Sequence, residues 1–183
     1  MKNDLKQRIV QHIQISGPLP LAEYMHWCMA DREQGYYTSK HAIGRSGDFI
    51  TAPEVSQMFG ELIGVWAMET WRGLGKPALF NLVELGPGRG TLMSDLLRAA
   101  KSMPEFLSSC KVQMIETSGP FVEEQSEKLD AYDNIQWHAS IDEIANQPTI
   151  VIANEFLDVL PIRQYVKSNR SEEHTSELQS HLN

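Results

Sequence analysis

The sequence predicts an α/β fold in which helices flank a parallel sheet. Short apolar segments alternate with segments of helical period through residues 78–153, an order typical of parallel strands joined by right-handed crossovers. A glycine-rich turn joins the first of these strands directly to a helix, as in nucleotide-binding α/β proteins. The 183 residues, of which 42% are apolar and 22% are charged, suit a single globular domain.

The first part of the chain is predicted to be helical. Apolar residues recur at helical spacing over residues 4–15 and 21–29, which predicts two helices. A third helix is predicted from Ala52 to Gly73, because a proline in the first turn and an acidic neighbour suit a helix N-terminus.

Strands and helices then alternate. The predicted strands are 79–85, 112–115, 135–137 and 149–153, the predicted helices are 91–101, 118–129 and 141–145, and a further extended segment covers 159–166. In an open parallel sheet, ligands bind beyond the carboxyl ends of the strands. We therefore expect the functional residues directly after each strand.

The turn after the first strand contains Glu84, Gly86, Gly88 and Gly90 at alternate positions. Glycine allows positive φ and close approach of a ligand to the backbone, and the N-terminus of the following helix attracts negative charge. A dinucleotide motif requires a third glycine where Thr91 stands, and a phosphate-binding P-loop requires a lysine that this turn lacks. The remaining pattern suits S-adenosyl-L-methionine (SAM), whose cationic amino-acid end needs a nearby carboxylate.

Two further strands end in polar residues that could contact the same ligand. Glu116 follows the second strand, where a carboxylate can accept hydrogen bonds from both ribose hydroxyls of SAM or of NAD. Alternatively, Glu116 is a helix cap or a solvated side chain. Ser140 follows the third strand, where it either contacts the adenine or caps a short helix in a capping box with Glu143.

The fourth strand is followed by Asn154, Glu155 and Asp158. Glu155 could hold a cationic nucleophile such as a guanidinium through a bidentate pair, and Asn154 could orient the acceptor through its amide. In the alternative interpretation, Asn154 caps a helix and Asp158 is solvated. We predict that Asn154 and Glu155 lie beside the methyl donor, on the acceptor side of the site.

The composition argues against several classes of protein. A net charge of −8 argues against binding to nucleic acid or to an anionic membrane surface, and no apolar run reaches the roughly 20 residues of a membrane helix. The two cysteines, Cys28 and Cys110, match neither a disulfide framework nor a metal site. We therefore expect a protein of a reducing compartment, the bacterial cytoplasm, without metal, nucleic-acid or membrane partners.

The segment 170–183, RSEEHTSELQSHLN, differs from the rest of the chain. It has no helical or strand period, and it resembles the in-frame translation of a sequencing-library adapter. The alternative is a disordered polar tail. We therefore leave this segment out of the predicted fold and expect the natural sequence to end near Asn169.

Four motifs together resemble the MidA-like family of class I SAM-dependent methyltransferases, to which the mitochondrial complex I assembly arginine methyltransferase belongs. They read GDFITAPEVSQMFGELIGVW, LVELGPGRGTLMSDLLR, IETSGP and ANEFLDVLPIRQY. The resemblance implies a Rossmann-like class I methyltransferase fold. It implies an N-terminal helical cap over 1–77 and a SAM-binding α/β domain over 78–169, truncated before its last strands.

The resemblance also implies a cofactor, an acceptor and a set of residues. SAM is the cofactor, the acceptor is an arginine side chain of a protein, and eukaryotic relatives work in the mitochondrial matrix. The acceptor-side motif matches Asn154, Glu155 and Asp158. The cofactor loop matches Glu84, Gly86, Gly88 and Gly90, the ribose-binding acid matches Glu116, and the segment against the pocket matches Gly47, Asp48, Thr51, Pro53 and Glu54.

Two alternatives remain open. The chain could be a binding or assembly protein that keeps the SAM fold, with Trp27, Tyr36 and Tyr37 on its partner surface. These aromatic residues could instead pack between the N-terminal helices. The second alternative is an NAD-dependent oxidoreductase, against which Thr91 argues because it stands in place of the third glycine.

Overall fold

A computed structural model describes residues 4–31, 33–36, 50–167 and 175–177. The chain divides into two compact units. One unit consists of Met1–Ser39 together with Asp158–Asn183, and the other is Lys40–Leu157. The second holds the sheet and the glycine turn, and we call it the sheet unit.

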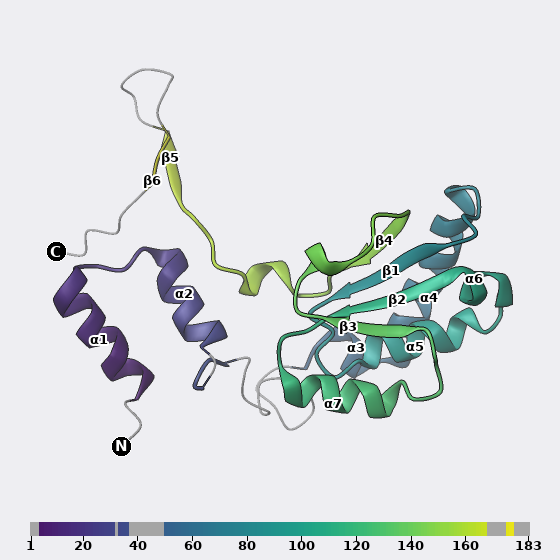
Figure 1. Cartoon of the computed structure of the whole chain (residues 1–183), viewed down its shortest axis with the longest axis horizontal. Helices are drawn as coiled ribbons and strands as arrows, with labels where there is room; N and C mark the ends of the chain where they lie inside the picture. Colours follow the sequence, from purple (N-terminus) through teal and green to yellow (C-terminus); the bar gives the residue numbers. More distant parts are fainter. Residues whose placement is uncertain (1–3, 32, 37–49, 168–174, 178–183) are drawn as a thin grey trace. The chain divides into compact units, whose positions relative to one another are not determined.

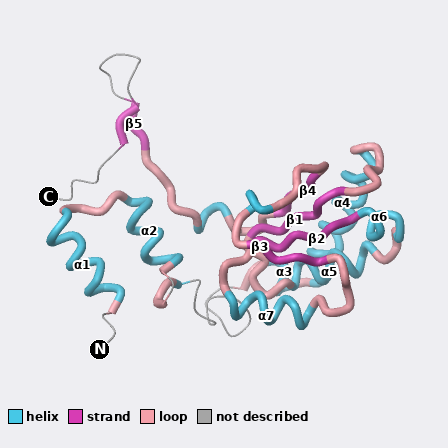
Figure 2. Tube along the Cα trace, viewed as in Figure 1, coloured by secondary structure: helices cyan, strands magenta, loops and turns pink. Residues whose placement is uncertain are grey.

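Four parallel strands form the sheet, as predicted (Figures 1 and 2). They are β1 (Phe80–Leu85), β2 (Cys110–Ile115), β3 (Ile135–His138) and β4 (Thr149–Ile152), in the order β3-β2-β1-β4. The register pairs Leu85 with Ile115 and Ile115 with His138, so the strands end along one edge. The strand order reverses at β1 and β4, which is where open α/β sheets bind ligands.

Helices α4 (Gln57–Gly73), α5 (Thr91–Ala100) and α7 (Gly119–Lys128) lie on one side of the sheet (Figure 1). Helix α5 is amphipathic, and its apolar face packs against β1 and β2 because every third or fourth residue is apolar. Each fully buried large apolar side chain contributes about 1.5–3 kcal/mol. The buried residues of this core include Leu92, Met93, Leu96 and Leu97 from α5, Phe80 and Leu82 from β1, and Val112 and Met114 from β2.

An aromatic cluster closes the end of the core opposite the glycine turn. The ring of Phe106 lies 5.1 Å from that of Phe80 and 5.8 Å, edge-on, from that of Trp71. The Trp71 indole donates a hydrogen bond of 3.1 Å to the Pro77 carbonyl. Phe106 belongs to α6 (Pro104–Ser109), a helix absent from our prediction. Its proline in the first turn is the sequence signal that indicates it.

The single helix predicted over 52–73 is wrong at one residue. Ser56 is extended (φ −150°, ψ 123°) and separates α3 (Ala52–Val55) from α4. The Ser56 hydroxyl accepts a hydrogen bond of 3.3 Å from the amide of Met58. Serine favours this capping geometry over a helix interior because its side chain replaces a missing backbone acceptor.

Three C-terminal elements differ from the prediction. The helix predicted over 141–145 is a 3-10 turn, η2 (Ile141–Glu143), and the extended segment begins with another, η3 (Leu157–Val159). Strand β5 (Tyr165–Lys167) then pairs antiparallel with β6 (Thr175–Glu177). Strand β6 lies within 170–183, the segment that we left out of the predicted fold.

The predicted N-terminal helices are present as α1 (Leu5–Ser16) and α2 (Leu21–Ala30). Arg8 of α1 pairs with Asp31 at 2.6 Å, and its guanidinium lies 5.9 Å from the centroid of the Trp27 ring. His12 contacts the same ring at 5.5 Å. Trp27 therefore packs between the two helices. Tyr36 is half-buried, and Tyr37 lies outside the described residues.

Helices α4 and α5 approach each other through two glycines of α4. A Cβ atom at Gly64 would lie 2.9 Å from the Leu96 carbonyl oxygen, and a Cβ at Gly60 would lie 2.6 Å from Cβ of Asp95. We expect Gly64→Ala to lower the free energy of unfolding by about 1–3 kcal/mol, because the helices must separate. Urea denaturation measures the change.

The matched control is Gly73→Ala in the last turn of α4, where an added Cβ meets nothing within 4 Å. Alanine is the better helix former, so this variant should be at least as stable as the wild type. Equal stability of Gly64→Ala and the wild type would contradict the close helix contact.

Candidate functional site

The loops that follow β1, β2 and β3 are joined at one edge of the sheet. The Gly86 amide donates a 3.1 Å hydrogen bond to the Ile115 carbonyl, and the Glu116 amide donates a 3.0 Å hydrogen bond to the His138 carbonyl. These bonds continue the parallel ladder by one residue beyond each strand. The predicted glycine turn and Glu116 are therefore neighbours in space.

The glycine turn requires its glycines. Gly86, Gly88 and Gly90 have φ values of +60°, +53° and +70°, a left-handed conformation that L side chains rarely adopt. Gly90 is also the residue before the first turn of α5. The turn thus presents backbone, with no side chain at three of its five positions, to whatever binds at the sheet edge.

Glu84 lies directly beneath this turn and is buried, with 3% of its surface exposed. Its Oε2 atom has no hydrogen-bond partner among the residues that the structure describes. Burial raises the pKa of this carboxyl to about 8, because the charged form is poorly solvated there. An unpartnered buried carboxyl group fits a cationic ligand group, whose charge would compensate the carboxylate.

Glu116 is oriented by the backbone that follows it. Its Oε1 accepts hydrogen bonds of 2.8 Å from the amides of Thr117 and Ser118. Burial raises the pKa of Glu116, and these hydrogen bonds oppose that effect. With Oε1 occupied, Oε2 is the atom available to accept a hydrogen bond from a ribose hydroxyl.

The loop after β4 contacts the glycine turn. A Cβ atom at Gly86 would overlap with Cδ2 of Phe156, so the phenyl ring packs directly on the turn. Asn154 is half-buried, and the exposed Glu155 has a φ of +50°. Non-glycine residues in this conformation are strained and concentrate at functional sites. Asp158 is exposed in η3, where the other compact unit begins.

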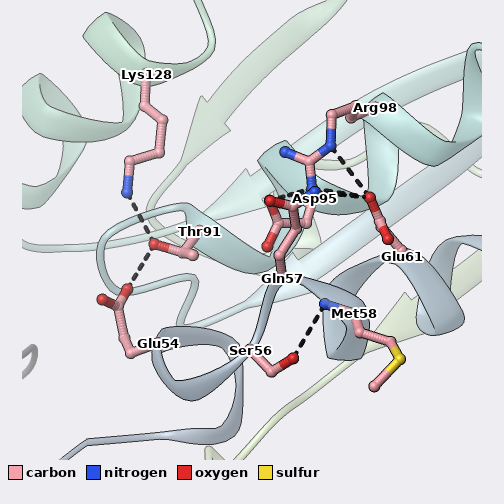
Figure 3. A network of polar contacts seen from close by, with 9 residues as sticks. All are labelled: Glu54, Ser56, Gln57, Met58, Glu61, Thr91, Asp95, Arg98 and Lys128. Carbon is pink, nitrogen blue, oxygen red and sulfur yellow. Dashed lines mark hydrogen bonds and ion pairs between the residues drawn. The ribbon is translucent and has the colours of Figure 1, made fainter.

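A polar network joins α3 to the start of α5 and to α7 (Figure 3). The Thr91 hydroxyl donates a 2.5 Å hydrogen bond to Oε1 of Glu54 and accepts a 2.8 Å hydrogen bond from Nζ of Lys128. Arg89 of the glycine turn lies 3.6 Å from Oε2 of Glu54. Burial lowers the pKa of Lys128, and the negative charge of Glu54 opposes this. Thr91, which breaks the dinucleotide motif, thus connects the predicted residue Glu54 to the turn.

The other predicted residues have varied surroundings. Thr51 precedes α3, and its carbonyl accepts hydrogen bonds from the amides of Glu54 and Val55. Pro53 is buried in that helix. Ser140 caps η2, and its capping box with Glu143 is confirmed. The adenine contact of Ser140 stays a prediction. Gly47 and Asp48 lie outside the described residues.

Sequence reasoning missed two side chains that contact these loops, Gln125 of α7 and Phe156. Gln125 is buried and bonds to the Gly88 carbonyl. No sequence signal distinguishes it from the other polar residues of α7. Phe156 is an apolar residue directly after Glu155, but nothing in the sequence indicates its contact with Gly86.

Comparison with known families decides the assignment. Residues 62–182 match the model of a family described as "Putative S-adenosyl-L-methionine-dependent methyltransferase". The chain belongs to this family. Membership in a family of SAM-dependent methyltransferases agrees with the predicted cofactor, SAM, and speaks against the oxidoreductase alternative.

The chain is also similar to curated proteins from animals. The chain is 39% identical over 192 residues to "Protein arginine methyltransferase NDUFAF7 homolog, mitochondrial" of Caenorhabditis elegans, covering 92% of this chain and 45% of the relative. It is 35% identical to the human "Protein arginine methyltransferase NDUFAF7, mitochondrial", covering 88% and 42%. The chain therefore spans less than half the length of these relatives.

The fold agrees with that of a solved structure. A Burkholderia thailandensis protein crystallised with S-adenosyl-homocysteine superposes with a TM-score of 0.71 at 24% identity, covering 91% of this chain and 44% of that one. The predicted Rossmann-like class I fold is thus confirmed. Among the residues that our structure describes, no helix is long and apolar enough to cross a membrane.

Proposed function

We propose that this chain binds SAM at the glycine turn and acts as a protein arginine methyltransferase. The observation that carries the proposal is the buried carboxyl of Glu84, two residues before a turn of three left-handed glycines, whose Oε2 has no hydrogen-bond partner in the described part of the chain. Its environment suits a cationic amino-acid group and not a diphosphate. The names of the curated relatives support arginine as the acceptor.

The sheet edge offers a separate group for each part of the cofactor. Glu84 would lose its proton and pair with the α-ammonium group, and Glu116 would accept hydrogen bonds from the ribose hydroxyls. The turn's backbone would lie against the ligand between them. Bound SAM would supply a methyl group activated on a sulfonium.

The acceptor would be held by the loop after β4. The ring of Phe156 packs on Gly86, which brings the loop after β4 close to the glycine turn. Asn154 and Glu155 belong to the same loop. The Glu155 carboxylate would pair with a guanidinium and hold one nitrogen in line for transfer, which lowers the entropic part of the barrier. The Glu155 carboxylate would also accept the proton that the nitrogen loses.

Charge and cysteine content support the remaining parts of the proposal. A net charge of −8 favours a cationic protein segment over nucleic acid as the partner. Cys28 and Cys110 are both free thiols, which suits a reducing compartment such as the bacterial cytoplasm.

Transfer of labelled methyl from SAM to arginine-containing proteins tests the proposal, with methylarginine identified by mass spectrometry. We expect Glu155→Gln to lower kcat by about 100-fold or more, because the variant can neither balance the guanidinium charge nor take its proton. Glu127→Gln, a substitution of the exposed α7 residue Glu127, is the matched control and should leave the rate unchanged.

Two outcomes would contradict the proposed activity. Binding of SAM without any transfer of label would favour the alternative of a binding or assembly protein that keeps the SAM fold. Label on residues other than arginine would support methyltransferase activity but contradict arginine as the acceptor.

A further inference from the structure

Gln125 is fully buried, and its amide bonds to strand β3 and to the loops that follow β1 and β2. Its Nε2 donates a 2.6 Å hydrogen bond to the Gly88 carbonyl, and its Oε1 accepts a 2.8 Å hydrogen bond from Nε1 of Trp137. The same Nε2 lies 3.5 Å from Oε2 of Glu116. The three partners follow or end β1, β3 and β2, respectively.

The orientation of this amide is determined by its partners. The Trp137 indole N–H can only donate, and the Gly88 carbonyl can only accept. The oxygen of Gln125 must therefore face Trp137, which directs the amide nitrogen toward Gly88 and Glu116. A carboxylate of the same shape could not donate to either acceptor.

The aliphatic part of the Gln125 side chain packs against the glycine turn at Gly90. A Cβ atom at Gly90 would lie 3.1 Å from Cγ of Gln125. The turn thus packs on the stem of this side chain while its carbonyl is held by the amide. One residue of α7 contacts both ends of the Gly88–Gly90 segment.

We propose that Gln125 is a positioning residue of the SAM site, holding the glycine turn in its left-handed form and directing Oε2 of Glu116 toward the ribose. The inference rests on the proposed function. A buried amide costs free energy unless its polar atoms are paired, and an apolar side chain would fill the same volume. A fully paired network fixes one arrangement of its members, which is what a site built from two separate loops and a strand needs.

The test compares two ligands in calorimetric titrations of the 183-residue chain. The ligands are S-adenosyl-homocysteine (SAH) and its 2′-deoxyribose analogue, which lacks one hydroxyl that Glu116 would bind. We expect the wild type to bind SAH about tenfold more tightly than the analogue, the value of one hydrogen bond to a charged group. Gln125→Met should weaken SAH binding about tenfold and reduce this discrimination to about twofold.

The matched control is Gln113→Met. Gln113 is also buried, with 3% of its surface exposed, and its amide bonds to His138 at 2.6 Å. Its loss should lower the unfolding midpoint yet leave the ratio of the two affinities unchanged. Should Gln125→Met fail to fold, Gln125→Glu keeps the side-chain shape, places a carboxylate beside Glu116 and should show the same loss of discrimination.

Retention of the wild-type affinity ratio by a folded Gln125 variant would overturn the positioning role, whatever the loss of stability. That result differs from the failure of the proposed function, in which the wild type itself binds neither ligand. In the latter case the inference falls with the function on which it rests.

Discussion

Glu84→Gln is expected to remove most of the pH dependence of stability between pH 5.5 and 7.5. The pKa of Glu84 is about 8 in the folded chain and about 4.3 in an unfolded one. Within this window the folded state therefore holds a proton that the unfolded chain releases. The wild-type free energy of unfolding should fall as pH rises, by about 1.4 kcal/mol per pH unit from this group.

Urea denaturation of the two proteins at both pH values measures the effect. The difference in free energy of unfolding between Glu84→Gln and the wild type should shift by about 2–3 kcal/mol in favour of the variant as pH rises from 5.5 to 7.5. The same variant should bind SAH about 10 to 100 times more weakly, because it loses a charge-assisted hydrogen bond. Glu127→Gln, with its exposed carboxylate, should change neither quantity. A stability difference that does not vary with pH would show that Glu84 is ionised in the folded chain.

Gly88→Val is expected to abolish detectable SAH binding or to weaken it by about 100-fold. Gly88 has a φ of +53°, a conformation that a β-branched residue essentially never adopts. Valine would force the turn into another form, and the carbonyl that Gln125 holds would move with it. Calorimetric titration with SAH gives the affinity of each protein.

Gly75→Val is the matched control for the effect of backbone strain alone. Gly75 has a φ of +84°, and an added Cβ meets nothing within 4 Å there. This variant should lose stability to a similar degree and still bind SAH as the wild type does. Equal SAH affinity of Gly88→Val and the wild type would reject the glycine turn as the cofactor site.

The sheet could be predicted because its strands are short, apolar and separated by helices of clear period. The parallel order follows from that alternation, and all four strands are found where the sequence indicates them. The misses are local. Ser56 ends one helix and caps the next, and the six residues of α6 are too few to show a period. Both depend on hydrogen bonds and packing that no period reveals.

The candidate site was predictable where a residue follows a strand directly. Glu84, Glu116 and the three glycines lie at the sheet edge because parallel strands end together. Gln125 could not be found in this way, since it reaches the site from the second turn of a helix. Phe156 was equally hidden, because its contact with Gly86 depends on how the chain turns after β4.

Proton release on ligand binding tests most directly whether the buried carboxyl of Glu84 receives the ammonium group of the cofactor. Calorimetric titration of SAH at pH 6.5, repeated in buffers of different ionisation enthalpy, counts the protons. At this pH the free carboxyl, with a pKa of about 8, is protonated, and an adjacent ammonium would return its pKa toward about 4.3. We predict one SAH per chain and the release of about one proton, which Glu84→Gln does not release. Binding of SAH with no difference in proton release between the wild type and Glu84→Gln would contradict this account of the site.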